Sequence, residues 1–76
     1  MKFNPAFWCR VSDVRFQSHL KIRRRSKYEV IGDIDGGCAL TIRFEDFEKD
    51  KKHLLFDSVE EGILFAERYE IEHSNS

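Results

Sequence analysis

This sequence lacks most of the features that assign a chain to a common protein class. Its 76 residues include two cysteines, Cys9 and Cys38, without CxxC spacing, and no apolar run approaches the roughly 18 residues of a membrane span. Residues 1–8 are too short and too mixed in character for a secretory signal peptide. We therefore expect a reduced, cytoplasmic protein without a membrane-spanning segment.

Motifs for catalysis and metal binding are also missing. No nucleophile lies in a recognisable elbow, and no glycine-rich loop opens a helix. Asp33, Asp35 and Gly36 match only part of a calcium loop, because the later oxygen ligands are absent. The residues that could ligate zinc do not have ligand spacing; they are Cys9, His19, Cys38, His53 and His73. We expect no enzymatic activity, no metal and no cofactor.

What is present is a chain long enough for one domain, residues 1–76, in which residues 1–5 and 73–76 are expected to be flexible. Seven phenylalanines and one tryptophan supply a small core. At about 25 cal/mol per Å² of buried apolar surface, such a core exceeds the chain entropy by a thin margin. A homodimer or a larger partner would therefore fit this chain.

Charge is nearly balanced overall, with a net value of −1, but it is unevenly distributed. Residues 1–31 carry eight basic and two acidic side chains, a net charge of +6. Residues 32–76 carry five basic and twelve acidic side chains, a net charge of −7. Such asymmetry bears on the choice of partner rather than on the fold.

Alternating apolar residues predict β-strands in the first part of the chain. Residues 7–16 alternate with a change of phase at Ser12, which indicates a bulge or a tight turn. The alternation continues to a charged apex at residues 23–27 and returns through Tyr28 and Val30.

The strongest turn signal follows at residues 32–37, where Asp-Gly and Gly-Gly supply the positive φ angles of a tight hairpin. Residues 38–47 then form the clearest predicted strand, and residues 53–56 form a short one.

Residues 56–72 predict one amphipathic helix. Ser58 is a suitable N-cap, and Glu61 stands three residues later, as in a capping box. The apolar stripe consists of Val59, Ile63, Phe65, Ala66 and Tyr69. The expected fold is therefore α+β, an antiparallel sheet of about four strands with one C-terminal helix packed on one face. The opposite face is left open, and we expect function there.

Basic residues in the first half are candidates for partner binding: Arg10, Arg15, Arg23, Arg24, Arg25 and Lys27. Arginine pairs bidentately with phosphate or carboxylate, and Lys21 and nearby aromatics (Phe7, Trp8 and Tyr28) could complete a stacking surface for RNA or single-stranded DNA. The alternative is a hydrated hairpin tip with no ligand. The net charge of −1 disfavours nucleic acid, since domains that bind it are usually basic as a whole.

Acidic residues form a second candidate surface. Glu45, Asp46 and Glu48, together with the acids of the predicted helix, could mimic nucleic-acid phosphates toward a basic partner. A solvated, non-functional acidic surface has the same sequence pattern.

Two segments, FWCRV (7–11) and FDSVEEGILFAERY (56–69), resemble the small podophage-encoded inhibitors of bacterial RNA polymerase. That family has an FW-x-x-V strand, a further strand, and a helix that opens on threonine or serine, followed by acid-glutamate and a later Ala-Glu. The match covers about a third of the chain, and the basic segment 15–27 departs from the family. The resemblance implies a compact, non-enzymatic protein that binds and blocks a large host machine, as anti-CRISPR proteins of similar size and build do.

We therefore expect a phage or mobile-element inhibitor that binds a host protein or ribonucleoprotein complex involved in nucleic-acid processing and acts by occlusion. Direct RNA or DNA binding through the basic N-terminal strands is the alternative. A homodimeric domain with another role is a third possibility.

Overall fold

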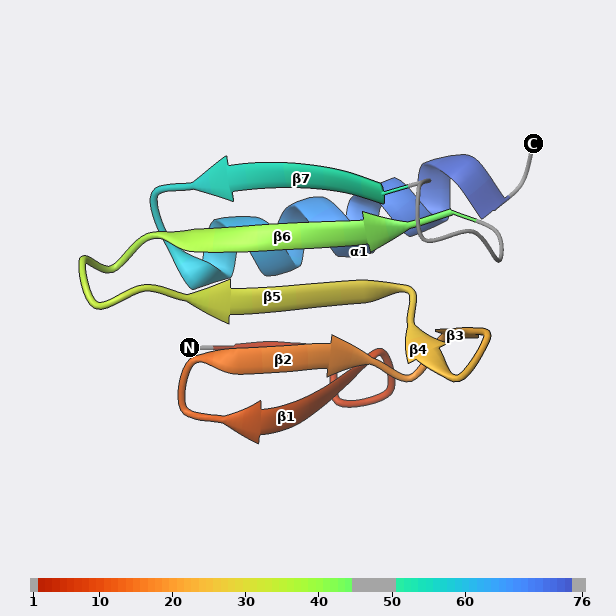
Figure 1. The fold of residues 1–76 in the computed structure, drawn as a ribbon, viewed down its shortest axis with the longest axis horizontal. Coiled ribbons are helices and arrows are strands. Elements are labelled where there is room, and N and C mark those ends of the chain that lie inside the picture. The colour runs from red at the N-terminus through yellow and green to blue at the C-terminus, as the bar shows by residue number, and fades with distance from the viewer. Residues whose placement is uncertain (1, 45–50, 75–76) are drawn as a thin grey trace.

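The computed structural model describes residues 2–44 and 51–74, which form an antiparallel sheet of five strands with one helix on one face (Figure 1). The sheet order is β1-β2-β5-β6-β7, and a separate two-stranded ribbon contains β3 and β4. The strands are β1 Trp8–Ser12, β2 Arg15–Ser18, β3 Lys21–Ile22, β4 Arg25–Ser26, β5 Tyr28–Gly32, β6 Cys38–Arg43 and β7 Lys51–Phe56; the helix α1 is Val59–Ser74. The α+β class and the helix on one face are confirmed, but the predicted number of about four strands is too low.

The extra strand arises in residues 8–18, where the change of phase marks a turn between two strands. β1 and β2 are joined through Asp13 and Val14, and their register shifts between Arg10 and Ser12. The Val14 carbonyl accepts a hydrogen bond from Gly32 N at 2.6 Å, so this turn is tied to the end of β5. Both interpretations of the phase change, a turn and an irregular register, hold here.

The basic segment forms a side hairpin rather than a continuation of the main sheet. β2 ends at Ser18, whose hydroxyl accepts a hydrogen bond from Tyr28 N at 3.0 Å and donates one to the Leu20 carbonyl at 3.1 Å. The Ser18 side chain thus bonds the chain on both sides of residues 21–27. This segment leaves the main sheet after β2, and the chain returns to the sheet at β5. β3 and β4 pair only with each other, and Figure 1 shows them beyond the ends of β2 and β5.

The predicted turn at residues 32–37 joins β5 and β6. Gly36 has a φ of 92°, which glycine adopts without the steric penalty of a side chain. Asp33 N donates to the Gly37 carbonyl at 2.7 Å, and Gly36 N donates to the Asp33 carbonyl at 3.0 Å. The strand predicted for residues 38–47 is confirmed for Cys38–Arg43, which form β6 with every second residue buried; Phe44 lies outside the strand, and residues 45–47 lie outside the described residues.

The predicted N-cap of the helix is also confirmed. The Ser58 hydroxyl accepts a hydrogen bond from Glu61 N at 3.2 Å, and the Glu61 carboxylate accepts one from Asp57 N at 3.3 Å. α1 extends to Ser74 and so includes His73, whose ring stacks on Tyr69 at 3.8 Å.

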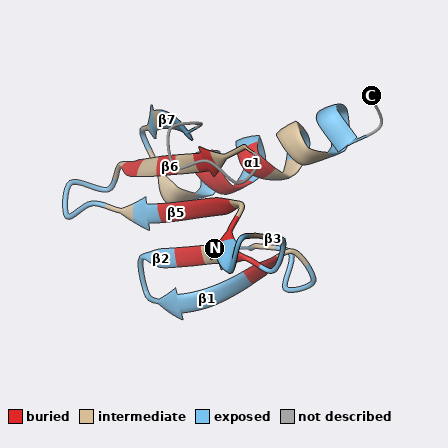
Figure 2. Ribbon diagram, turned by 45° about the vertical axis from the view of Figure 1, so that its right-hand side comes forward, coloured by how far each residue is buried: buried red, intermediate tan, exposed pale blue. Residues whose placement is uncertain are grey.

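The core lies between the sheet and α1. Figure 2 shows that buried residues concentrate in β2, β5, β6 and the first half of α1. The fully or nearly fully buried side chains are Trp8, Phe16, Tyr28, Val30, Cys38, Leu40, Ile42, Ile63 and Ala66. Residues near the N-terminus extend this layer over β2, where the Phe3 ring lies 5.0 Å from the Phe16 ring.

Polar side chains fasten α1 to the strands at the edge of the core. Trp8 Nε1 donates to a Glu67 carboxylate oxygen at 2.8 Å, and the Tyr28 hydroxyl donates to Glu70 at 3.0 Å. Burial, together with the hydrogen bond and charge of Glu70, raises the pKa of Tyr28 well above its usual value. Lys27 Nζ donates to the same Glu70 oxygen at 2.8 Å.

The helix lies close to the sheet at Gly62. A Cβ at this position would lie 2.7 Å from Cys38 Sγ, well inside van der Waals contact. The Cys38 thiol donates to the Ser58 carbonyl at 3.2 Å, and burial raises its pKa, so it is a neutral packing group. None of the described residues forms a helix with the length and apolar character needed to span a membrane.

Candidate binding site on the open face of the sheet

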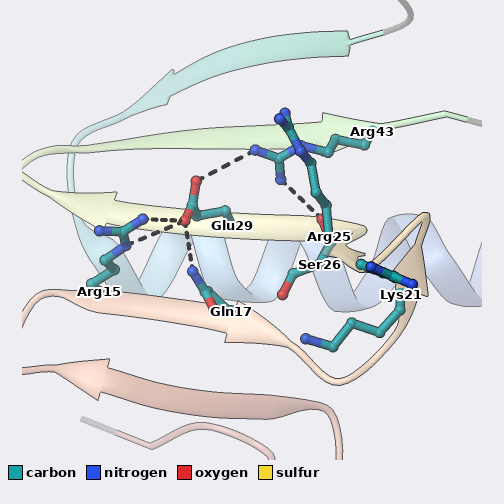
Figure 3. A pocket seen from close by; sticks show the side chains of 8 residues that line it. Arg15, Gln17, Lys21, Arg25, Ser26, Glu29 and Arg43 are labelled. Atoms are coloured by element: carbon teal, nitrogen blue, oxygen red, sulfur yellow. Dashed lines mark hydrogen bonds and ion pairs between the residues drawn. The ribbon is translucent and has the colours of Figure 1, made fainter. Parts of the chain in front are cut away.

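The candidate site occupies the sheet face that points away from α1. Consecutive residues of a strand point to opposite faces of a sheet. Val30 of β5 and Leu40 of β6 are buried beneath α1, so the residues next to them in sequence lie on the other face. The β3–β4 hairpin lies at one end of this face (Figure 3). We refer to it as the open face.

Strand register arranges the open face into rows. An apolar row runs across β5, β6 and β7 through Ile31, Ala39 and Leu55, with Arg15 of β2 next to Ile31. Leu55 is 83% exposed. This row therefore exposes the apolar side chains Ile31 and Leu55 to water beside an arginine.

The next row is polar and contains Gln17, Glu29, Thr41 and His53 at paired positions of β2, β5, β6 and β7. Thr41 Oγ1 and His53 Nδ1 are hydrogen bonded at 3.2 Å. Beyond this row, Arg43 and Lys51 are paired at the end of β6 and β7 that lies nearest the hairpin.

A pocket of about 260 Å³ lies where the hairpin overhangs the open face. Its lining residues are Arg15, Gln17, Lys21, Arg24, Arg25, Ser26, Glu29 and Arg43. Five of these side chains are cationic and one is acidic, which gives the lining a net charge of +4. We refer to it as the cationic pocket.

Glu29 lies at the centre of the cationic pocket, where it is only 9% exposed. One carboxylate oxygen accepts hydrogen bonds from Arg15 at 2.8 and 3.2 Å and from Gln17 Nε2 at 2.9 Å. The other oxygen lies 3.7 Å from an Arg43 nitrogen. Burial alone would raise the pKa of Glu29, but the hydrogen bonds from Arg15 and Gln17 and the two arginine charges outweigh it and lower the pKa. Glu29 is therefore ionised at neutral pH and holds the arginines in position.

Arg43 joins the sheet to the hairpin. Its Nη1 donates to the Ser26 carbonyl at 2.9 Å, and Figure 3 shows the guanidinium between Glu29 and Ser26. Its Nε is buried and has no hydrogen-bond acceptor among residues 2–44 and 51–74. An unsatisfied buried donor costs about 1–3 kcal/mol, so this arginine is held at the pocket at some expense of stability.

The turn between β3 and β4 has a strained backbone at two arginines, one of which lines the cationic pocket. Arg23 and Arg24 have φ angles of 47° and 70°, the left-handed region that glycine and asparagine occupy most readily. Two-residue hairpin turns need these angles, yet arginine occupies both positions. Strain of this kind is typical of functional sites.

The structure brings together only some of the predicted basic residues. Arg15, Arg24 and Arg25 line the cationic pocket, and Arg23 lies beside Arg24 in the turn. The other two are engaged elsewhere. Arg10 pairs with Asp13 at 3.2 Å and lies over the Phe16 ring, and Lys27 pairs with Glu70 of α1. The acidic candidates Glu45, Asp46 and Glu48 lie outside the described residues.

The expected aromatic stacking surface is wrong. Trp8 is 1% exposed and Tyr28 is fully buried, and the partly buried Phe7 ring lies 4.8 Å from Trp8 and 5.5 Å from Tyr28. Trp8 and Tyr28 belong to the core because their strand positions face α1, and Phe7 packs against it, so these rings do not form an exposed stacking surface.

Gln17, Ser26, Glu29 and Arg43 line the pocket but were not predicted as site residues. Alternation along residues 38–43 does place Arg43 on the face opposite Leu40, so part of the signal was present. The pairing of Arg15 and Gln17 with β5, which brings them to Glu29, was not readable from local sequence.

Comparisons of this chain with protein-family models, with curated proteins and with solved structures find no match. The similarity to RNA polymerase inhibitors therefore stays a prediction, and function has to be argued from the open face itself. None of the described residues forms a group of three or more potential metal ligands of the histidine, cysteine or carboxylate type.

Proposed function

We propose that this chain is a non-enzymatic binding module that docks through its open face on an acidic surface of a host protein or ribonucleoprotein complex and blocks that complex by occlusion. The observation that carries the proposal is the combination, on one uncovered face, of the cationic pocket and the apolar row. Arginine-rich and apolar groups side by side are favoured at the centre of protein interfaces.

The distribution of charge supports an acidic partner. The pocket lining has a net charge of +4, whereas exposed acids of α1, among them Glu60, Glu61 and Glu72, lie on the opposite side of the sheet. A molecule with charge separated in this way is oriented as it approaches a charged surface, which accelerates productive encounters.

The resemblance to podophage inhibitors supports the class of partner, a host machine that processes nucleic acid, and a cytoplasmic protein encoded by a phage or another mobile element. An anti-CRISPR role belongs to the same class, because it also consists of occluding a nucleic-acid-processing complex without catalysis.

Direct RNA or DNA binding is a second candidate, favoured by the arginines of the cationic pocket. Burial of Trp8 and Tyr28 weighs against it, since single-stranded nucleic acid is usually held by stacking on exposed aromatic rings. Binding of this kind would fall steeply with salt concentration, because it releases counterions from the phosphates.

The test is a pull-down from bacterial lysate, with and without nuclease, that compares two matched variants. Leu55→Glu changes an exposed leucine of the open face, and Leu64→Glu changes an exposed leucine of α1. We expect one complex to be retained after nuclease by the wild type and by Leu64→Glu but not by Leu55→Glu. Loss with Leu64→Glu alone would place docking on the helix and overturn the proposal. Loss of all partners on nuclease treatment would favour direct nucleic-acid binding.

A further inference from the structure

We propose that the cationic pocket is a binding site for one phosphate group. This inference goes beyond docking on a partner, because it concerns a ligand that the isolated chain would bind. At about 260 Å³ the pocket is close to the lower end, roughly 300 Å³, of small-ligand sites.

The charge of the lining distinguishes a phosphate from a carboxylate. Arg15, Lys21, Arg24, Arg25 and Arg43 surround a single internal acid, Glu29. A carboxylate carries a charge of −1 and has two acceptor oxygens, whereas a phosphate monoester carries about −1.5 to −2 at neutral pH and presents three acceptor oxygens, so it can pair with more of the cationic lining side chains. The lining therefore favours the more highly charged anion.

Part of the lining is already held in place. The ion pairs of Glu29 with Arg15 and Arg43 fix two guanidinium groups on opposite sides of the carboxylate (Figure 3). Arginines held in this way lose little side-chain entropy when an anion binds. Glu29 also repels an anion, so the bound phosphate would lie toward the hairpin, whose Lys21 and Arg24 line the pocket.

The turn of the hairpin also supplies a cation to the lining. The positive φ of Arg24 places a cationic side chain, rather than the glycine that the turn prefers, at the pocket lining.

The experiment titrates the isolated chain with inorganic phosphate and with acetate at constant ionic strength and follows amide shifts by NMR. We expect saturable phosphate binding, with a dissociation constant on the order of 1 mM, and shifts that concentrate in residues 15–29 and 41–43. We expect acetate to bind at least about tenfold more weakly.

A matched pair of double variants tests the location. Lys21→Met with Arg24→Gln removes two charges from the pocket, and Arg10→Gln with Arg68→Gln removes two exposed charges elsewhere. We expect the pocket double variant to weaken phosphate binding about tenfold and the control double variant to change it less than about twofold. Equal weakening in both pairs, equal binding of acetate, or shifts spread over α1 would overturn the proposal.

Two additional titrations identify the source of the phosphate. Tighter binding of a mononucleotide than of a short single-stranded oligonucleotide, lost in the pocket variant, would support a free phosphorylated ligand. Tighter binding of the oligonucleotide, also lost in that variant, would support a phosphodiester chain. Because no partner complex is present, failure here would leave the docking proposal standing, and failure of docking would leave phosphate binding measurable.

Discussion

The two faces of the sheet use consecutive residues of the same strands for different purposes. In β7, Leu54 is partly buried and packs against the core beneath α1, whereas Leu55 is largely exposed on the open face. In β5, Val30 is fully buried, whereas Glu29 gathers arginines on the other side. The helix face packs apolar side chains against α1, and the open face combines exposed apolar groups with charged groups.

The largest expected effect comes from replacing one leucine by alanine on each face of the sheet. Leu40→Ala removes a fully buried side chain of β6, and we expect it to lower the free energy of unfolding by about 3 kcal/mol. Leu55→Ala, on the adjacent strand but facing outward, should change it by less than about 0.5 kcal/mol. Urea unfolding measures both. Comparable losses would show that the open face also contributes a packed core.

The close approach of Gly62 to Cys38 on the helix face gives the next largest effect. Gly62→Ala would improve helix propensity by about 1 kcal/mol but places a methyl group against Cys38 Sγ, and we expect a net destabilisation of about 1–2 kcal/mol. Adding Cys38→Ala should relieve the clash, so the double variant should be more stable than the sum of the single changes. A thermal denaturation cycle measures this coupling, and additive effects would contradict it.

The third comparison uses pH to test how much the ionised Glu29 carboxylate on the open face contributes to stability. The folded-state pKa of Glu29 lies below its ordinary value of 4.5, so the ionised carboxylate contributes stability above that pH and the contribution is lost as pH falls through the folded pKa. Glu29→Gln should therefore destabilise the protein by about 1 kcal/mol at neutral pH and much less at about pH 3. Unfolding by urea at several pH values measures the difference, and a constant gap across this range would refute the assignment.

The smallest expected effect concerns the strained turn and has the opposite sign. Arg23→Asn with Arg24→Gly places the preferred residues at the two positive φ angles, and we expect a gain of about 0.5–1 kcal/mol in stability. Phosphate binding should weaken at the same time, because Arg24 lines the pocket. Calorimetry and the phosphate titration measure the two effects. A loss of stability would mean that the arginines support the hairpin instead of straining it.

Local patterns predicted the parts of the fold that depend on neighbours along the chain. The alternation of residues 38–43, the glycine turn at residues 32–37 and the Ser58 cap all act over a few residues, and each was confirmed. The strand count was too low because a two-residue turn between β1 and β2 leaves only a change of phase in the sequence.

Pairing between distant segments decided the rest. Ser18 bonds Tyr28 across the basic excursion, so Arg23 and Arg24 belong to a side hairpin that overhangs the open face.

The sequence by itself determined the α+β class, the capped helix and an uneven distribution of charge, because propensity, periodicity and charge are local properties. Only the tertiary structure decided that Trp8 and Tyr28 are core residues and that Arg43 joins Arg15 around Glu29. The physical reason is register: strand pairing, which no single segment encodes, sets which side chains share a face and which charges meet.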